Sequence, residues 1–188
     1  MRSAMVEDIC FHLVDLVQNS VAAGATTILL RIVESETQDT LTLAVTDNGR
    51  GMDGPTLEKV QDPFFTTKSF KKVGLGIPLL KATAQSCHGA FDIRSDAGRG
   101  TEVTARMERS HLDCPPLGDL RETLLSLLVS LDGVDLQFSY RSDRGEFDIS
   151  SGAIRRQVGE LHFSHPEIYR FLKGYIHEGL ERVLAPTA

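Results

Sequence analysis

The segment from Glu7 to Ala25 is apolar around almost its whole circumference when it is placed on a helix. Its polar exceptions Asp8, His12, Asp15 and Asn19 recur every three or four residues, so they form one narrow stripe. A helix that is apolar almost all round is buried, and carboxylates are costly to bury without partners. We therefore expect the stripe to face a cavity or a bound ligand.

The residues that follow predict a small mixed sheet with helices on one face. Runs rich in β-branched residues predict strands, whereas Pro55 and the stretch up to Gly89 predict helices. The strands are expected at residues 27–33, 40–46, 90–94 and 101–107, and the helices after Pro55 and at 74–88. Together with the first helix, these elements predict a two-layer α/β sandwich over residues 1–109.

A second part is predicted after the segment 110–118, where two prolines and a glycine interrupt the pattern. A leucine-rich helix over 117–131 is followed by a hairpin turning at 143–145, and Ser164-x-x-Glu167 predicts a capping box for a last helix. Residues 117–188 are therefore interpreted as a small α+β module with an interaction or dimerisation role.

Composition narrows the class of protein. The 188 residues carry a formal net charge of −6, which argues against nucleic acid as the main ligand. The chain has no apolar run of about 18 residues and no signal-peptide core, so we expect a cytoplasmic protein without a membrane segment. The three cysteines are scattered, which is typical of a reduced protein rather than a disulfide scaffold.

Three glycine pairs follow the first helix at the junctions between elements. Asp47-x-Gly49-x-Gly51 follows a strand, Gly74-x-Gly76 opens a helix, and Gly98-x-Gly100-Thr101 leads into a strand. Glycine lets the backbone approach a ligand closely, and a helix N-terminus presents free N–H groups to phosphate. One such pair means little, but three in this order after the polar stripe are a strong signal for a site that binds a phosphate-bearing ligand.

Residues 7–107, which contain these motifs, resemble the Bergerat-fold ATP-binding domain. This domain is shared by gyrase, the Hsp90 chaperones, histidine kinases and the mismatch-repair ATPases. DLVQNSVAAGAT resembles the mismatch-repair version of the N-box, and DNGRGM is similar to the G1 box. DPFFTTK, GLGIPLLKATAQSCHG and SDAGRGTEVTARM resemble the F, G2 and G3 segments of histidine kinases.

The resemblance implies a role for each matching position. Asn19 would coordinate Mg²⁺ through its amide oxygen, and Asp47 would accept a hydrogen bond from the adenine amine, supported by Thr101. Lys68 would meet phosphate from a lid. The remaining nucleotide-binding positions are those that shape the pocket and the lid: Gly49, Gly51, Met52, Gly74, Leu75 and Gly76.

Two departures from the family pattern bear on activity. Asp15 stands where hydrolysing members carry a longer glutamate that activates water, so fast hydrolysis is not expected, although Asp15 stays the candidate catalytic residue. Only about ten residues precede the N-box, so a sensor kinase with its own phosphoacceptor helix is not expected either.

Two functions therefore remain open. One is a stand-alone histidine or serine kinase, or phosphotransfer ATPase, that acts with ATP and Mg²⁺ on a partner protein. The other is an ATP-gated interaction module with little turnover, and a homodimer is possible in either case. Residues 110–188 carry no motif that decides between them.

Overall fold

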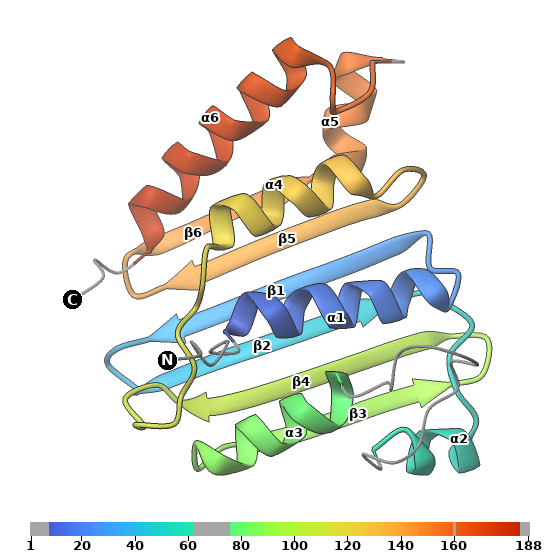
Figure 1. The fold of residues 1–188 in the computed structure, drawn as a ribbon, viewed down its shortest axis with the longest axis vertical. Coiled ribbons are helices and arrows are strands. Elements are labelled where there is room, and N and C mark those ends of the chain that lie inside the picture. The colour runs from blue at the N-terminus through green and yellow to red at the C-terminus, as the bar shows by residue number, and fades with distance from the viewer. Residues whose placement is uncertain (1–7, 62–75, 160, 185–188) are drawn as a thin grey trace, which may run out of the picture.

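The computed structural model describes residues 8–61, 76–159 and 161–184. It forms one six-stranded sheet in the order β3-β4-β2-β1-β5-β6, with helices α1, α3 and α4 packed side by side in front of it (Figure 1). The strands are β1 (Thr27–Ser35), β2 (Thr40–Asp47), β3 (Ala90–Asp96), β4 (Gly100–Glu108), β5 (Asp135–Ser142) and β6 (Gly145–Ser150). The helices are α1 (Ile9–Ala22), α2 (Gly54–Lys59), α3 (Gly76–Ser86), α4 (Leu120–Ser130), α5 (Ser151–Val158) and α6 (Pro166–Val183).

The alternation of side chains along the strands places the core on one face of the sheet. In β2, Leu41, Leu43 and Val45 are buried beneath the helices, while the residues between them are only partly covered or exposed. The two-residue period of a strand makes this division, because successive side chains point to opposite faces. The expected α/β architecture with helices on one face is confirmed.

The C-terminal part extends this sheet. Strand β5 pairs in parallel with β1, with Ile28 opposite Leu136, and β6 then pairs antiparallel with β5. The sequence predicts a separate small module, whereas the structure joins its two strands to the same sheet. The physical reason is that the outer edge of β1 offers unpaired backbone groups, which β5 satisfies. The division into units 1–109 and 117–188 itself stays a prediction.

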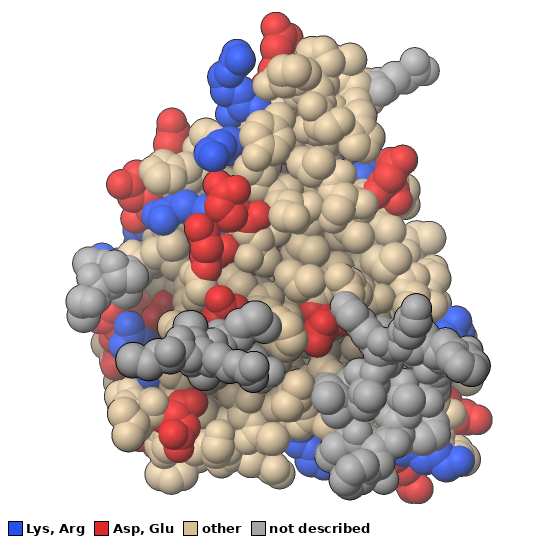
Figure 2. All heavy atoms as spheres, viewed as in Figure 1, with Lys and Arg blue, Asp and Glu red and all other residues tan. Residues whose placement is uncertain are grey.

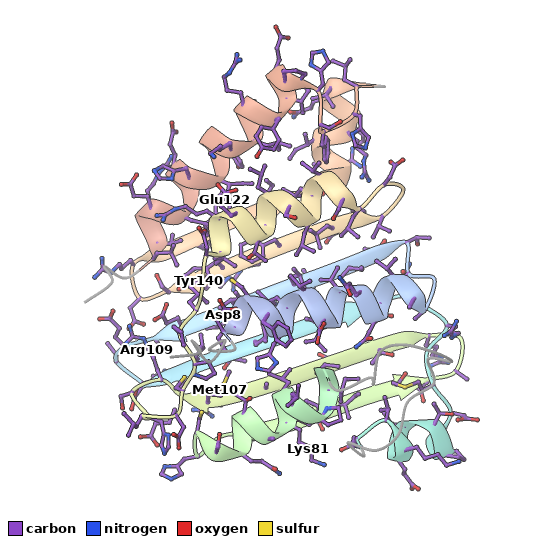
Figure 3. All side chains as sticks on the ribbon, in the orientation of Figure 1. Asp8, Lys81, Met107, Arg109, Glu122 and Tyr140 are labelled. Carbon is purple, nitrogen blue, oxygen red and sulfur yellow. The ribbon has the colours of Figure 1, made fainter. Side chains whose placement is uncertain are left out.

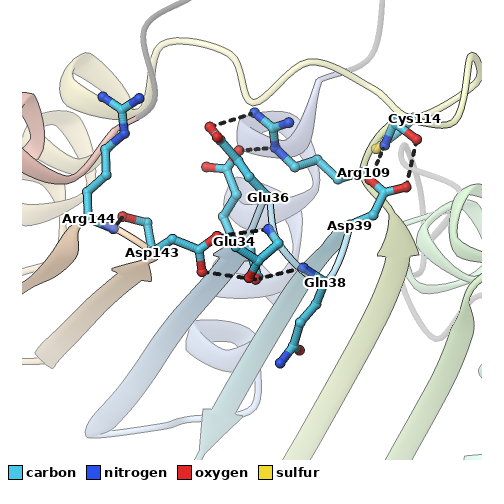
Figure 4. Close-up of polar contacts among 12 residues, drawn as sticks. Glu34, Glu36, Gln38, Asp39, Arg109, Cys114, Asp143 and Arg144 are labelled. Atoms are coloured by element: carbon cyan, nitrogen blue, oxygen red, sulfur yellow. Dashed lines mark hydrogen bonds and ion pairs between the residues drawn. The ribbon is translucent and has the colours of Figure 1, made fainter.

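A cluster of polar side chains binds the start of the connection between β4 and α4 to one end of the sheet (Figure 4). Glu34 of β1 accepts hydrogen bonds from the Arg109 guanidinium and from the Tyr140 hydroxyl of β5. Burial and the bond to Glu34 raise the pKa of Tyr140 above its ordinary range, so the hydroxyl remains a donor. Beside it, the Asp39 carboxylate accepts from the Ser110 N–H and hydroxyl at 2.8 and 2.7 Å.

The N-terminal turn of α1 corrects part of the expected stripe. Asp8 is the N-cap residue, whose carboxylate accepts from the Phe11 N–H at 2.7 Å, so it lies at the start of the helix rather than facing a cavity (Figure 3). An N-terminal aspartate satisfies one of the open backbone donors there. Phe11 and Val21 are 38% and 41% exposed, so α1 is buried on one side only.

The C-terminal part differs from the sequence prediction in two local details. The helix α6 begins at Pro166 with His165 as N-cap, and the Ser164 hydroxyl bonds to His162 Nδ1 instead of capping the helix. The expected capping box is therefore wrong, because proline takes the first helical position. Helix α5 was not expected from the sequence, and it follows directly from β6 with Ser150 as its N-cap.

No helix among residues 8–61, 76–159 and 161–184 combines the length and the apolar composition that crossing a bilayer requires. On the helix-covered face, acidic and basic side chains lie close together around α4 and α6 (Figure 2). The middle of this face is mostly uncharged.

Helix α6 approaches the sheet closely at Gly179. A Cβ atom added there would lie 2.1 Å from the ring of Phe147, which is itself buried between Phe138 and Tyr175. The neighbouring helical Gly174 has nothing within 4 Å of its Cβ position. The absence of a side chain at Gly179 therefore sets the distance between α6 and the sheet.

This contact predicts opposite effects of the same substitution at two glycines. Gly179→Ala should lower the free energy of unfolding by about 1–3 kcal/mol, because a confined ring must move. Gly174→Ala should leave it unchanged or raise it by up to about 1 kcal/mol through helix propensity. Urea denaturation followed by circular dichroism measures both, and equal effects would contradict the packing described.

Candidate functional site

A cavity of about 480 Å³ opens between α1, the ends of β2 and β4, and the loop that follows β2. Its lining combines apolar side chains with several polar groups, which is the usual composition of a small-molecule site. The apolar part comprises Leu16, Ala22, Ala23, Val45, Val60, Ile77, Ala97 and Val103. The remaining lining residues are Asn19, Ser20, Asp47, Arg50, Gly51, Met52, Asp53, Thr56 and Thr101.

The Asp47 carboxylate, which lines this cavity, is held by two donors. The hydroxyl of Ser20, which is 3% exposed, donates to Asp47 Oδ2 at 2.7 Å. The Gly49 N–H donates to Oδ1 at 2.8 Å. Because a carboxylate has further lone pairs, Asp47 can still accept a hydrogen bond from a ligand. Its position follows from β2, where residue 47 continues the inward-facing series of 41, 43 and 45.

The loop after Asp47 is fixed at both ends by backbone contacts. The Asn48 side-chain oxygen accepts from the N–H groups of Thr26 and Thr27, both at 2.9 Å. The Arg50 N–H donates to the Ala23 carbonyl, and the Arg50 carbonyl accepts from Gly98. These bonds tie the loop to the end of α1 and to the β3–β4 turn, so it forms a preformed wall of the cavity.

Gly51 is required by geometry in this wall. Its φ is +63°, a left-handed conformation that favours glycine, and a Cβ atom there would lie 1.9 Å from the Asp96 carbonyl oxygen. A larger residue would push the loop away from the β3–β4 turn. The glycine therefore allows the two segments to close the base of the cavity together.

The β3–β4 hairpin contributes a pair of hydroxyls, of which that of Thr101 lines the cavity. Ser95 Oγ lies 2.9 Å from Thr101 Oγ1, 2.8 Å from the Gly100 carbonyl oxygen and 2.9 Å from the Met52 N–H. Thr101 faces Asp47 in the register of β2 and β4, so both side chains lie on the helix-covered face. The hairpin thus connects the loop after β2 to the floor of the site.

The polar stripe of α1 is divided between different surroundings. Asn19 lines the cavity. Asp15, one turn earlier, lies beside the start of α3, where a Cβ atom on Gly76 would come within 3.2 Å of its Oδ2 atom. His12 is buried, with Nε2 3.4 Å from the Thr83 hydroxyl.

Most of the residues that the sequence predicts as a site are brought together. The cavity lining includes Asn19, Asp47, Gly51, Met52 and Thr101. Gly49 is adjacent, as a donor to Asp47, and Gly76 lies against Asp15. Lys68, Gly74 and Leu75 lie outside the described residues. The roles of all these positions in binding stay predictions.

Two hydroxyls and most of the apolar wall of the cavity were not predicted from the sequence. Ser20 follows Asn19 directly, and Ser95 lies just beyond the predicted strand 90–94, so no periodicity singles out either residue. The apolar members Val45 and Val103 could have been found, because each stands two residues along a strand from Asp47 or Thr101. Strand alternation places such residues on the same face.

Comparison with known proteins identifies the family. Residues 7–111 match the family described as histidine kinase-, DNA gyrase B-, and HSP90-like ATPase. This match spans more than half of the 188 residues. The chain belongs to this family of ATPases. The resemblance of the sequence to histidine-kinase-like ATP-binding domains of the Bergerat fold is therefore confirmed.

Curated relatives share the same region. The sensor protein kinase FleS of Pseudomonas aeruginosa is 40% identical over 90 residues, which are 48% of this chain and 22% of that protein. The sporulation kinase C of Bacillus subtilis is 28% identical over 88 residues, 47% of this chain and 20% of that protein. The chain thus aligns with about a fifth of the length of these two kinases.

Solved structures with a related arrangement include ShkA in complex with AMPPNP. This likeness has a TM-score of 0.43 and 20% sequence identity, and it covers 52% of this chain and 20% of that one. The N-terminal domain of a DNA repair protein has a TM-score of 0.45 at 13% identity, covering 76% of this chain and 51% of that one.

Membership of the ATPase family supports ATP binding. If the cavity holds the nucleotide, as the sequence predicts, removing Asp47 should have a marked effect. Asp47→Ala should weaken ATP binding roughly 10- to 100-fold, because a hydrogen bond to a charged group is lost and its buried partners are left unpaired. Isothermal calorimetry measures the dissociation constant. Asp148→Ala on the exposed face of β6 is the matched control, and an unchanged dissociation constant for Asp47→Ala would contradict the assignment.

Proposed function

We propose that the protein binds Mg-ATP in this cavity and transfers the γ-phosphoryl group to a partner protein. The observation that carries the proposal is the Asp47 carboxylate, which lines the cavity and is held in place by Ser20 and Gly49. A fixed acceptor of this kind suits the exocyclic amine of adenine. The apolar wall formed by Val45, Ile77 and Val103 suits the faces of the base.

The phosphates are proposed to lie toward α1 and the start of α3. Asn19 lines the cavity on that side, and Asp15 lies one helical turn away beside Gly76. Carboxamide and carboxylate oxygens are the hard ligands that Mg²⁺ prefers, so these side chains fit the ion chemically. Bound together with ATP, Mg²⁺ would neutralise charge that develops on the transferred group.

Asp15 is proposed to orient the attacking nucleophile. Its carboxylate lies against the first residue of α3, where the missing side chain of Gly76 leaves room beside it. A carboxylate at this position can accept a proton from a hydroxyl, an imidazole or water. The direct test of function is to incubate the protein with γ-labelled ATP, alone and with proteins encoded beside it, and to find where the label goes.

One observation favours the second function, an ATP-gated interaction module. The first turn of α1 is bonded to the connection that leads into α4, through Ile9 N–H to Pro116 and Cys10 N–H to Leu117 at 3.0 and 3.1 Å. The helix that carries Asp15 and Asn19 is thereby linked to the C-terminal part. In this function, nucleotide binding would change the position of α1 and hence partner affinity, with little turnover.

The proposed metal site predicts an effect that depends on Mg²⁺. Asn19→Ala should weaken ATP binding in Mg²⁺ at least several-fold more than in EDTA, because only the metal-bound complex uses the amide oxygen. Calorimetry under both conditions gives the two ratios. Gln18→Ala, on the exposed side of the same helix, is the control, and equal losses for Asn19→Ala under both conditions would exclude a metal role.

The two functions are separated by Asp15→Asn, which keeps the shape and removes the proton acceptor. For a kinase, ATP affinity should stay within a few-fold, while single-turnover phosphoryl transfer falls by about 10²–10⁴. Asp8→Asn is the control, because it removes the same charge from the same helix and asparagine caps equally well.

Measurable wild-type transfer that survives Asp15→Asn undiminished would refute the role of Asp15. Wild-type protein that shows no turnover with any candidate partner, but binds one of them only with ATP, would favour the interaction module instead.

A further inference from the structure

Three polar side chains form one row across neighbouring strands at the floor of the cavity. Ser95 of β3 is opposite Thr101 of β4, and Thr101 is opposite Asp47 of β2. Directly opposed residues of antiparallel strands place their side chains on the same face. The row therefore runs under the site from the β3–β4 hairpin to the carboxylate, with Ser20 of α1 above its far end.

The hydrogen bonds of Ser95 fix the direction of its bond to Thr101. A serine hydroxyl has one proton and two lone pairs. The Gly100 carbonyl, 2.8 Å away, can only accept, so it takes the Ser95 proton. The lone pairs of Ser95 then receive the Met52 N–H and the Thr101 hydroxyl, both at 2.9 Å. The proton of Thr101 is thus directed at Ser95, and only its lone pairs are left for the cavity.

Like Thr101, Asp47 presents only hydrogen-bond acceptors to the cavity, but for a different reason. An ionised carboxylate only accepts hydrogen bonds, and its orientation is fixed by the Ser20 hydroxyl and the Gly49 N–H. Asp47 and Thr101, which are neighbours in the row, therefore both present acceptors to a ligand. An amino group that donates to both is satisfied there, because it carries two protons, whereas an oxygen in the same place can only accept and leaves both unpaired.

We propose that Ser95 is a specificity-determining positioning residue, which makes this end of the cavity acceptor-only and so selects 6-amino over 6-oxo purine nucleotides. The inference rests on the proposed nucleotide function and adds a residue below the cavity that does not touch the base. The amino group of adenine is a donor, whereas the 6-oxygen of guanine or hypoxanthine is an acceptor. Discrimination of this kind is strong when the mismatched ligand leaves polar groups unpaired.

The test compares ATP with inosine triphosphate, which differs at the 6-position and in the protonation of the neighbouring ring nitrogen. In Ser95→Ala the Thr101 hydroxyl loses its acceptor and can turn its proton toward the cavity, where it can donate to a 6-oxygen. The ratio of the two dissociation constants should shift toward inosine triphosphate by roughly 3- to 10-fold, the size of one hydrogen bond. Ser95→Thr, which retains the hydroxyl, should keep the wild-type ratio.

A double-mutant cycle separates this role from a purely structural one. Loosening of the Met52 loop would weaken both nucleotides alike and leave their ratio unchanged. In a Thr101→Val background, Ser95→Ala should no longer change the ratio, because the group that it orients is gone. Ser142→Ala is the matched control, since Ser142 also donates to a carbonyl, that of Val183, and accepts from a backbone N–H, that of Arg144.

The outcomes distinguish this inference from the proposed function. Wild-type protein that binds neither nucleotide would overturn both. Wild-type protein that prefers ATP, with a ratio that Ser95→Ala leaves unchanged, would overturn the role of Ser95 and leave the nucleotide site standing. A ratio that shifts equally with and without Thr101 would likewise overturn it, because the effect would not pass through that hydroxyl.

Discussion

The Asp47 carboxylate lies at the end of a strand, beneath a helix and beside an apolar wall, where an ionised group without partners would be costly. The surrounding structure supplies those partners from two directions. Ser20 donates from α1 above, and the Gly49 N–H donates from the loop that follows. With both donors in place, the carboxylate can still accept a further hydrogen bond. The same two bonds therefore stabilise the buried carboxylate and leave it able to bind a ligand.

The loop after β2 can serve as a wall because it is bonded to three separate segments. Asn48 holds it to the start of β1, Arg50 to the end of α1 and Met52 to the β3–β4 hairpin. These contacts are made largely by backbone groups, which explains why glycine is needed where the segments approach most closely, at Gly51 and Gly100. A preformed cavity lowers the entropic cost of binding a ligand.

The C-terminal part is physically continuous with the nucleotide-binding part. Its strand β5 lies along β1, its tyrosine Tyr140 donates to Glu34 of β1, and the connection before α4 binds the first turn of α1. Helix α1, which carries Asp15 and Asn19, therefore borders the cavity and also contacts α4 and the connection before it. In the proposed kinase, the nucleotide would act within the cavity. In the proposed ATP-gated module, nucleotide binding would change the position of α1 relative to α4 and so the affinity for a partner.

The sequence by itself determined most of the elements, the α/β class and several polar positions of the cavity, among them Asn19, Asp47 and Thr101, because strand alternation and glycine motifs are local properties of the chain. The placement of residues 41, 43, 45 and 47 on one face follows from the two-residue period alone. The position of Asp8 as an N-cap, the partner of His12 and the hydroxyls of Ser20 and Ser95 were decided by tertiary structure. Each of these depends on which distant segment supplies a donor or acceptor, and no periodicity along the chain encodes that. The same holds for the pairing of β5 with β1, where backbone groups 108 residues apart complete each other's hydrogen bonds.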